Sequence, residues 1–117
     1  MADLTIYEKP TCTTCRNLSA LLDERGIEAD RVNYHVEGLT EDEIRGLLAK
    51  AGVGPHEVLR TREPVYEELG LAGREISDDE LIALMAQHPQ LVQRPIVVRG
   101  DRAVLARPIE RVLELLD

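Results

Sequence analysis

YEKPTCTTCRN, residues 7–17, holds both cysteines of the chain and joins two segments of different periodicity. Residues 4–7, LTIY, are typical of a strand, and Lys9-Pro10 is expected to end it. From residue 13 to about 25 apolar residues recur at helical spacing, and Gly26 follows as a stop. Because a strand leads into the segment and a helix leads out of it, Cys12 is expected at the N-terminus of the first helix.

This position favours a reactive Cys12. The first turn of a helix has unpaired N–H groups and a partial positive charge, which stabilise a thiolate and also bind anions. Two other interpretations of the Cys12-x-x-Cys15 spacing stay open: part of a zinc site, or two buried and inert cysteines. The histidines lie in dispersed segments, which disfavours zinc: His35, His56 and His88.

The other strand signals lie at residues 31–35 and at the end of the chain. Residues 95–98 and 103–105, separated by the turn residues Gly100-Asp101, predict a hairpin. Pro108 suits the first turn of a last helix. The residues expected on its core side are Ile109, Val112, Leu113 and Leu116. A helix-linked parallel pair plus a hairpin predicts an α/β fold with a mixed sheet covered by helices on both faces.

Two further helices are expected between the second strand and the hairpin. Each begins with a Ser or Thr followed three residues later by Glu, the spacing of a capping box. The pairs are Thr40 with Glu43 and Ser77 with Glu80. Gly52 is expected to end the first of these helices, and residues 57–69 between the two predict short helical turns.

Composition and charge narrow the function further. The chain has 117 residues and a formal net charge of -8, and we expect a single soluble domain over residues 1–117. An acidic chain disfavours nucleic-acid binding, and an anionic substrate would need a local basic patch. The N-terminus does not resemble a signal peptide, and the apolar runs are too short to span a membrane. We therefore expect a cytoplasmic protein, where a structural disulfide is disfavoured.

Arg60, Arg94 and Arg107 are the candidate anion-binding residues, because they lie in different segments near apolar or proline-bounded stretches. A guanidinium group matches a tetrahedral oxyanion in two-point contacts. Arg94 precedes Pro95 at the opening of the predicted hairpin, where a cis peptide bond is one alternative and a simple strand-edge proline the other. For most surface arginines a solvated role is the alternative interpretation.

Four segments resemble the glutaredoxin-linked arsenate reductases. They are YEKPTCTTCRN from Tyr7, YEELGL from Tyr66, QHPQLVQRPIVV from Gln87 and ARPIERVLELL from Ala106. The resemblance covers the whole chain with matching spacing. It implies a thioredoxin-like mixed sheet of about four strands flanked by helices, with a helical insertion at about residues 40–90 between the second strand and the hairpin.

The resemblance also implies roles for individual residues. Cys12 matches the nucleophilic cysteine of that family. Arg60, Arg94 and Arg107 match its three anion-binding arginines. Pro95 matches the superfamily's cis-proline beside the active cysteine, and Asn17 resembles a residue with a minor supporting role.

The implied reaction is the reduction of arsenate to arsenite in a monomer that binds no cofactor, metal or nucleic acid. Cys12 forms a thiol–arsenate adduct, and a second thiol then resolves it. Many members of the family have Ser at the position of Cys15 and use glutathione as that thiol, with glutaredoxin resetting the enzyme. Here Cys15 could be the resolving thiol, with thioredoxin also able to reduce the product, or it could be a small apolar residue of the helix.

Glu8 is a second departure, because members of the family commonly have His there. A carboxylate beside Cys12 would oppose its ionisation, so we expect the helix N-terminus and the arginines to lower the pKa of Cys12. The alternative function is that of the Spx-type redox regulators, which resemble this chain in the CxxC loop and at Arg94-Pro95-Ile96 and bind RNA polymerase. The segment Ala106-Arg107-Pro108 favours the reductases.

Overall fold

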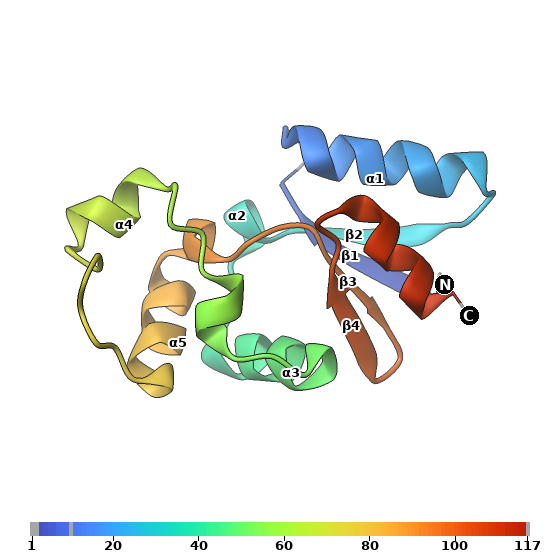
Figure 1. Ribbon diagram of the computed structural model, residues 1–117. Coiled ribbons are helices and arrows are strands. Elements are labelled where there is room, and N and C mark those ends of the chain that lie inside the picture. Colours follow the sequence, from blue (N-terminus) through green and yellow to red (C-terminus); the bar gives the residue numbers. More distant parts are fainter. Residues whose placement is uncertain (1–2, 10, 117) are drawn as a thin grey trace.

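The computed structural model describes residues 3–9 and 11–116 (Figure 1). Pro10, expected to end the first strand, lies outside the described residues. A four-stranded mixed sheet has the order β2-β1-β3-β4. Its strands are β1 (Leu4–Glu8), β2 (Ala29–Asn33), β3 (Ile96–Arg99) and β4 (Arg102–Leu105). β1 and β2 are parallel, whereas β3 is antiparallel to both β1 and β4. The mixed sheet expected from the sequence is therefore confirmed.

Helix α1 (Thr13–Glu24) connects β1 to β2 and packs on one face of the sheet together with η3 (Ile109–Leu115). Side chains alternate along β1, so Leu4 and Ile6 point to this face, where they meet leucines of α1. The apolar cluster between these layers comprises Leu4, Ile6, Leu18, Leu22, Val97, Val104, Ala106, Val112 and Leu115. α1 is thereby held with its N-terminus at the end of β1.

The helices between β2 and β3 in the chain lie on the other side, where the helix of residues 41–51 packs against β4 and those further along extend beyond the sheet (Figure 1). The elements are α2 (Tyr34–Glu37), α3 (Glu41–Ala51), η1 (Pro55–Val58), α4 (Pro64–Glu68), α5 (Asp78–Gln87) and η2 (Pro89–Leu91). α3 and α5 pack together and contribute buried residues to one continuous cluster with β3 and β4. None of the helices in the described part of the chain is long and apolar enough to cross a membrane.

The predicted helix ends are confirmed at α3 and α5. The Thr40 hydroxyl accepts a hydrogen bond from Glu43 N at 3.1 Å, and Thr40 N donates to Glu43 Oε1 at 3.1 Å. Gly52 ends α3 in the left-handed region with φ of 69°, which a residue without a Cβ adopts at little cost. The Ser77 hydroxyl caps α5 by accepting from Glu80 N at 3.2 Å, but the Glu80 carboxylate accepts from Arg74 and does not complete the expected capping box.

Two predictions of the sequence differ from the structure. The second strand was expected over residues 31–35 but ends at Asn33, because Tyr34 starts α2 and is buried with its hydroxyl donating to Val92 O at 2.6 Å. The last helix is a 3₁₀ helix, in which buried positions recur every third residue. Val112 and Leu115 are therefore the buried residues, while the expected Ile109, Leu113 and Leu116 are only partly buried.

The α3 cap gives a stability prediction. Thr40→Ala removes the acceptor of the Glu43 N–H, and we expect it to lower the free energy of unfolding by about 1 kcal/mol. Urea unfolding followed by circular dichroism measures the loss. Thr61→Ala, in an exposed loop position, is the matched control and should change stability little. Equal stability of the two variants would contradict a stabilising role for the cap.

Candidate active site

Cys12 is the N-cap residue of α1 and has extended backbone dihedrals, φ -74° and ψ 127°. Its N–H donates to Lys9 O at 2.9 Å, and its carbonyl accepts the first helical hydrogen bond from Arg16 N at 3.0 Å. The turn from β1 into α1 is thus closed around the cysteine. Half-buried at the helix N-terminus, the side chain of Cys12 lies where the sequence analysis expected it.

The pKa of the Cys12 thiol is lowered to about 7. Burial acts in the opposite direction, but hydrogen bonds from the backbone N–H and thiol of Cys15 and from the Arg94 guanidinium favour the thiolate, as does the positive charge of Arg94. The helix N-terminus and an arginine therefore lower the pKa of Cys12, as expected. Near neutral pH a substantial fraction of Cys12 is thiolate and can act as a nucleophile.

Cys15 has the opposite electrostatic character. It is 1% exposed, and burial raises the pKa of its thiol to about 12, with the charges of Cys12 and Glu8 acting in the same direction. A hydrogen bond from the Lys9 backbone N–H offsets this only in part. Both cysteines are free thiols in this structure. The two residues of one CxxC segment are therefore a half-buried thiol of lowered pKa and a buried thiol of raised pKa.

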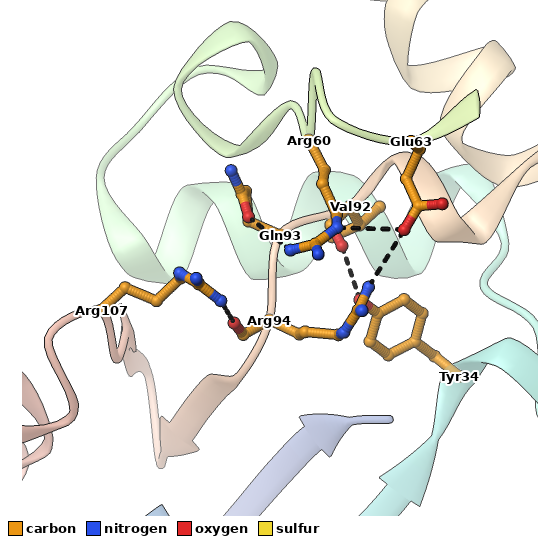
Figure 2. Close-up of polar contacts among 7 residues, drawn as sticks. All are labelled: Tyr34, Arg60, Glu63, Val92, Gln93, Arg94 and Arg107. Atoms are coloured by element: carbon orange, nitrogen blue, oxygen red, sulfur yellow. Dashed lines mark hydrogen bonds and ion pairs between the residues drawn. The ribbon is translucent and has the colours of Figure 1, made fainter. Parts of the chain in front are cut away.

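Arg94 is the cation beside Cys12, and it is 5% exposed. Its guanidinium lies between Tyr34 and Glu63, with Nη1 3.5 Å from Glu63 Oε1 (Figure 2). Arg94 Nε and Nη1 are buried and make no hydrogen bond within the described residues. The Arg94–Pro95 peptide bond is cis, the isomer that the resemblance implies.

The other two candidate arginines contact the same segment rather than one another. Arg60 Nε donates to Glu63 Oε1 at 3.0 Å, and Arg60 Nη1 donates to Gln93 Oε1 at 3.4 Å (Figure 2). Arg107 Nη1 donates to Arg94 O at 2.8 Å. The three arginines thus gather around residues 93–94, from three distant parts of the chain. Of the three, only Arg94 is seen to act directly on Cys12.

Glu63 and His35 belong to this site, although the sequence analysis did not single them out. Glu63 Oε1 forms ion pairs with both Arg60 and Arg94. The positive charges of Arg94, Lys9 and Arg60 lower the pKa of His35, after the larger effect of burial. These three positive charges form the local basic patch that this acidic chain needs in order to bind an anionic substrate. In the sequence, only the Arg–Pro pairs indicated this basic patch, because Glu63 and His35 belong to no recognisable motif.

Glu8 is 3% exposed, and its Oε1 lies 3.4 Å from Arg31 Nη1. Burial raises the pKa of this carboxyl, while Arg31 lowers it. The negative charge of Glu8 also raises the pKa of the Cys15 thiol, an effect that the sequence did not indicate. Asn17 is exposed on α1. No group of three or more His, Cys, Asp or Glu residues in the described part of the chain could hold a metal ion.

A mixed sheet whose first strand leads through a cysteine N-cap into a helix, with a buried arginine beside the thiolate, defines a redox-active protein of thioredoxin-like architecture. Comparison with known proteins identifies the branch. The chain belongs to the ArsC family, whose family model matches residues 7–115.

Individual relatives agree with this assignment. The chain is 42% identical over 116 residues to an arsenate reductase of Escherichia coli K12, covering 99% of this chain and 82% of the relative. It is 34% identical over 112 residues to an arsenate reductase of Haemophilus influenzae, covering 95% and 97% of the two chains. The solved structure of an arsenate reductase from Vibrio cholerae is similar with a TM-score of 0.88 and 38% identity, covering 95% of each chain.

The site predicts how Arg94 controls the nucleophile. Arg94→Gln removes the positive charge and the guanidinium donor, so we expect the pKa of Cys12 to rise from about 7 toward that of a free thiol. The absorbance of the thiolate, recorded as a function of pH, measures the change. Arg62→Gln removes the same charge at an exposed position that is not among the causes of the lowered Cys12 pKa, and should leave the titration unchanged. An unshifted Cys12 in the Arg94 variant would show that the helix N-terminus alone lowers this pKa.

Proposed function

We propose that this protein reduces arsenate to arsenite, with Cys12 as the nucleophile and Arg94 as the principal oxyanion partner. The observation that carries the proposal is the pairing of a Cys12 thiolate, with a pKa of about 7, and a buried guanidinium that contacts it. Membership of the ArsC family and the arsenate reductases among its relatives support the same substrate.

In the first step the Cys12 thiolate attacks arsenic and displaces hydroxide, which forms a Cys12–arsenate adduct in which arsenic is still As(V). Arg94 offers N–H groups that have no hydrogen-bond acceptor in the described residues. Guanidinium groups bind tetrahedral oxyanions through such donors and stabilise the charge that develops on oxygen. Arg60 and Arg107, held around residues 93–94, complete the anion-binding set in this proposal.

In the second step another thiol attacks the sulfur of the adduct, arsenic takes the bonding electron pair, and arsenite leaves as As(III). Cys15 is the nearest candidate, because its thiol and backbone N–H both contact Cys12. The product would be a Cys12–Cys15 disulfide. Glutathione, as a co-substrate with no bound cofactor involved, is the alternative second thiol, and Asn17 beside the loop retains a minor supporting role.

The reductant that resets the enzyme is glutaredoxin with glutathione, or thioredoxin. Both require a compartment that keeps thiols reduced, so we propose that the protein acts in the cytoplasm, as a monomer. No nucleic acid or membrane takes part in this reaction.

Arsenate-dependent oxidation of NADPH tests the proposed activity. One assay contains glutathione, glutaredoxin and glutathione reductase, and the other contains thioredoxin and its reductase. We expect turnover in at least one, lost in Cys12→Ser, and falling as pH drops below about 7 because the thiolate becomes protonated. The active assay identifies the reductant. Absence of turnover in both would overturn the proposal and favour a redox regulator, for which binding to RNA polymerase is the next measurement.

Cys15→Ser tests the identity of the second thiol. If Cys15 resolves the adduct, one turnover without glutathione leaves a disulfide, seen by mass spectrometry as the loss of two protons, and Cys15→Ser abolishes this product. In the thioredoxin assay we expect the variant to lose most activity. Full activity of Cys15→Ser in both assays would show that an external thiol performs the second step.

A further inference from the structure

Glu8 occupies a position where the packing calls for an apolar side chain. Side chains alternate along β1, and Leu4, Ile6 and Glu8 are the buried residues of the face that meets α1. The first two lie in the apolar cluster with Leu18 and Leu22 of α1. A carboxylate in the third position, 3% exposed, is costly unless it has a partner or a role.

Cys15 is the first buried residue of α1, the helix that follows β1 and Glu8. β1 leads into α1, whose buried residues are Cys15, Leu18 and Leu22, so Cys15 and Glu8 lie at the same end of the two elements. The Cys15 thiol accepts a hydrogen bond from the N–H of Lys9, the residue next to Glu8. The negative charge of Glu8 is also among the charges that act on Cys15. The buried carboxylate therefore lies close enough to the buried thiol for its charge to raise the pKa of Cys15.

A chain of polar contacts links the Glu8 carboxylate to the backbone carbonyl of Cys15. Glu8 Oε1 lies 3.4 Å from Arg31 Nη1, Arg31 Nη1 donates to Ser19 Oγ, and Ser19 Oγ donates to Cys15 O at 3.2 Å. Glu8, Ser19 and Arg31 also line a surface groove of about 530 Å³. A proton that reaches Glu8 can leave through this groove without crossing the apolar core.

The chemistry of the second step requires such a group. Cys15 holds its proton at neutral pH because burial raises the pKa of its thiol to about 12, yet the thiolate is the form that attacks a sulfur. Cys12 cannot take this proton, because its sulfur is bonded to the leaving group at that stage. The resolving step therefore needs another acceptor within reach of the buried thiol.

We propose that Glu8 accepts the proton of the Cys15 thiol as Cys15 attacks Cys12, so that a residue of β1 activates the resolving cysteine. The inference rests on the proposed function in that Cys15 is the second thiol. As the Cys15 S–H bond breaks, its proton goes to the Glu8 carboxylate and the Cys15–Cys12 S–S bond forms. The Cys12–arsenic bond breaks, and its electron pair reduces As(V) to As(III). Both sulfurs are oxidised to the disulfide, and Glu8 later releases its proton through the groove.

The charges around Glu8 set the pH dependence of this step. Arg31 on β2 lowers its pKa and burial raises it, with burial the larger effect. Arg16 and Asp23 of α1 and Glu37 of α2 line the same groove, and the Cys15 thiol faces Glu8 from α1. The carboxylate is the active form, so the rate of the second step falls as pH drops through the raised pKa of Glu8.

An aromatic disulfide such as dithiobis(nitrobenzoate), supplied at one equivalent, separates the two thiols without arsenate. Attack by Cys12 releases the first chromophore and leaves a mixed disulfide, and attack by Cys15 on Cys12 releases the second. Glu8→Gln should slow the second phase about a hundredfold and leave the first unchanged. Its second phase should also lose the acidic limb of the pH profile, while Asp23→Asn, in the same groove, should keep the parent's rates.

The sign of the effect distinguishes a proton acceptor from a mere charge. If Glu8 only repels the Cys15 thiolate, Glu8→Gln lowers the pKa of Cys15 and accelerates the second phase, which would overturn the proposal, as would an unchanged rate. If Glu8→Gln also disturbs the first phase, Glu8→Asp decides. A retained acidic limb in Glu8→Asp supports the proposal, and loss of the limb overturns it.

A parallel single turnover with arsenate, without glutathione, separates this inference from the proposed function. If arsenate yields no disulfide in the parent while the aromatic disulfide gives a Glu8-dependent second phase, arsenate reduction fails and the role of Glu8 stands. If arsenate is reduced and the second phase does not depend on Glu8, the function stands and the inference fails.

Discussion

The contact between the Arg94 guanidinium and Cys12 is the interaction on which the rest of the site depends. The net charge of -8 disfavours a thiolate at the N-cap of α1. A nearby positive charge must therefore stabilise the ionised form of Cys12. Arg94 can be buried there because Glu63 neutralises part of its charge and Tyr34 lies against it. Both partners come from the segment between β2 and β3, Tyr34 from α2 and Glu63 from the residue before α4, so this segment has a function beyond packing against the sheet.

The sequence predicts those parts of the fold whose cause is local. The capping pair at Thr40 and the turn at Gly100 depend on residues three or four apart, and both form as expected. Tyr34 shows where local pattern fails. Its alternation with Val32 indicated a strand, but burial of its ring and a hydrogen bond to Val92, 58 residues away, favour a helical turn instead. A contact of that sequence separation leaves no trace in the periodicity around residue 34.

The same distinction applies to the site. The residues next to Cys12 are enough to predict a reactive cysteine at a helix N-terminus. The clustering of Arg60, Arg94 and Arg107 could be predicted only from the family resemblance, because the three residues lie in distant segments of the chain. Glu63 had no motif and was missed, although it fixes two of those arginines. Glu8 was noticed only as a departure from the family, although the alternation along β1 already places it on the same side as Leu4 and Ile6.

The two cysteines illustrate how one short segment can contain two thiols of different reactivity. Cys12 lies at the helix end, where N–H groups and Arg94 lower its pKa, and Cys15 lies one turn further, where the core raises its pKa. Groups whose pKa values are pushed apart by their surroundings take different roles in a reaction. The order of the chemistry follows from this difference: the acidic thiol attacks first, and the buried thiol becomes a nucleophile only when its proton has somewhere to go. A buried carboxylate at the end of β1 destabilises the core, and the need for an acceptor of the Cys15 proton accounts for the presence of Glu8.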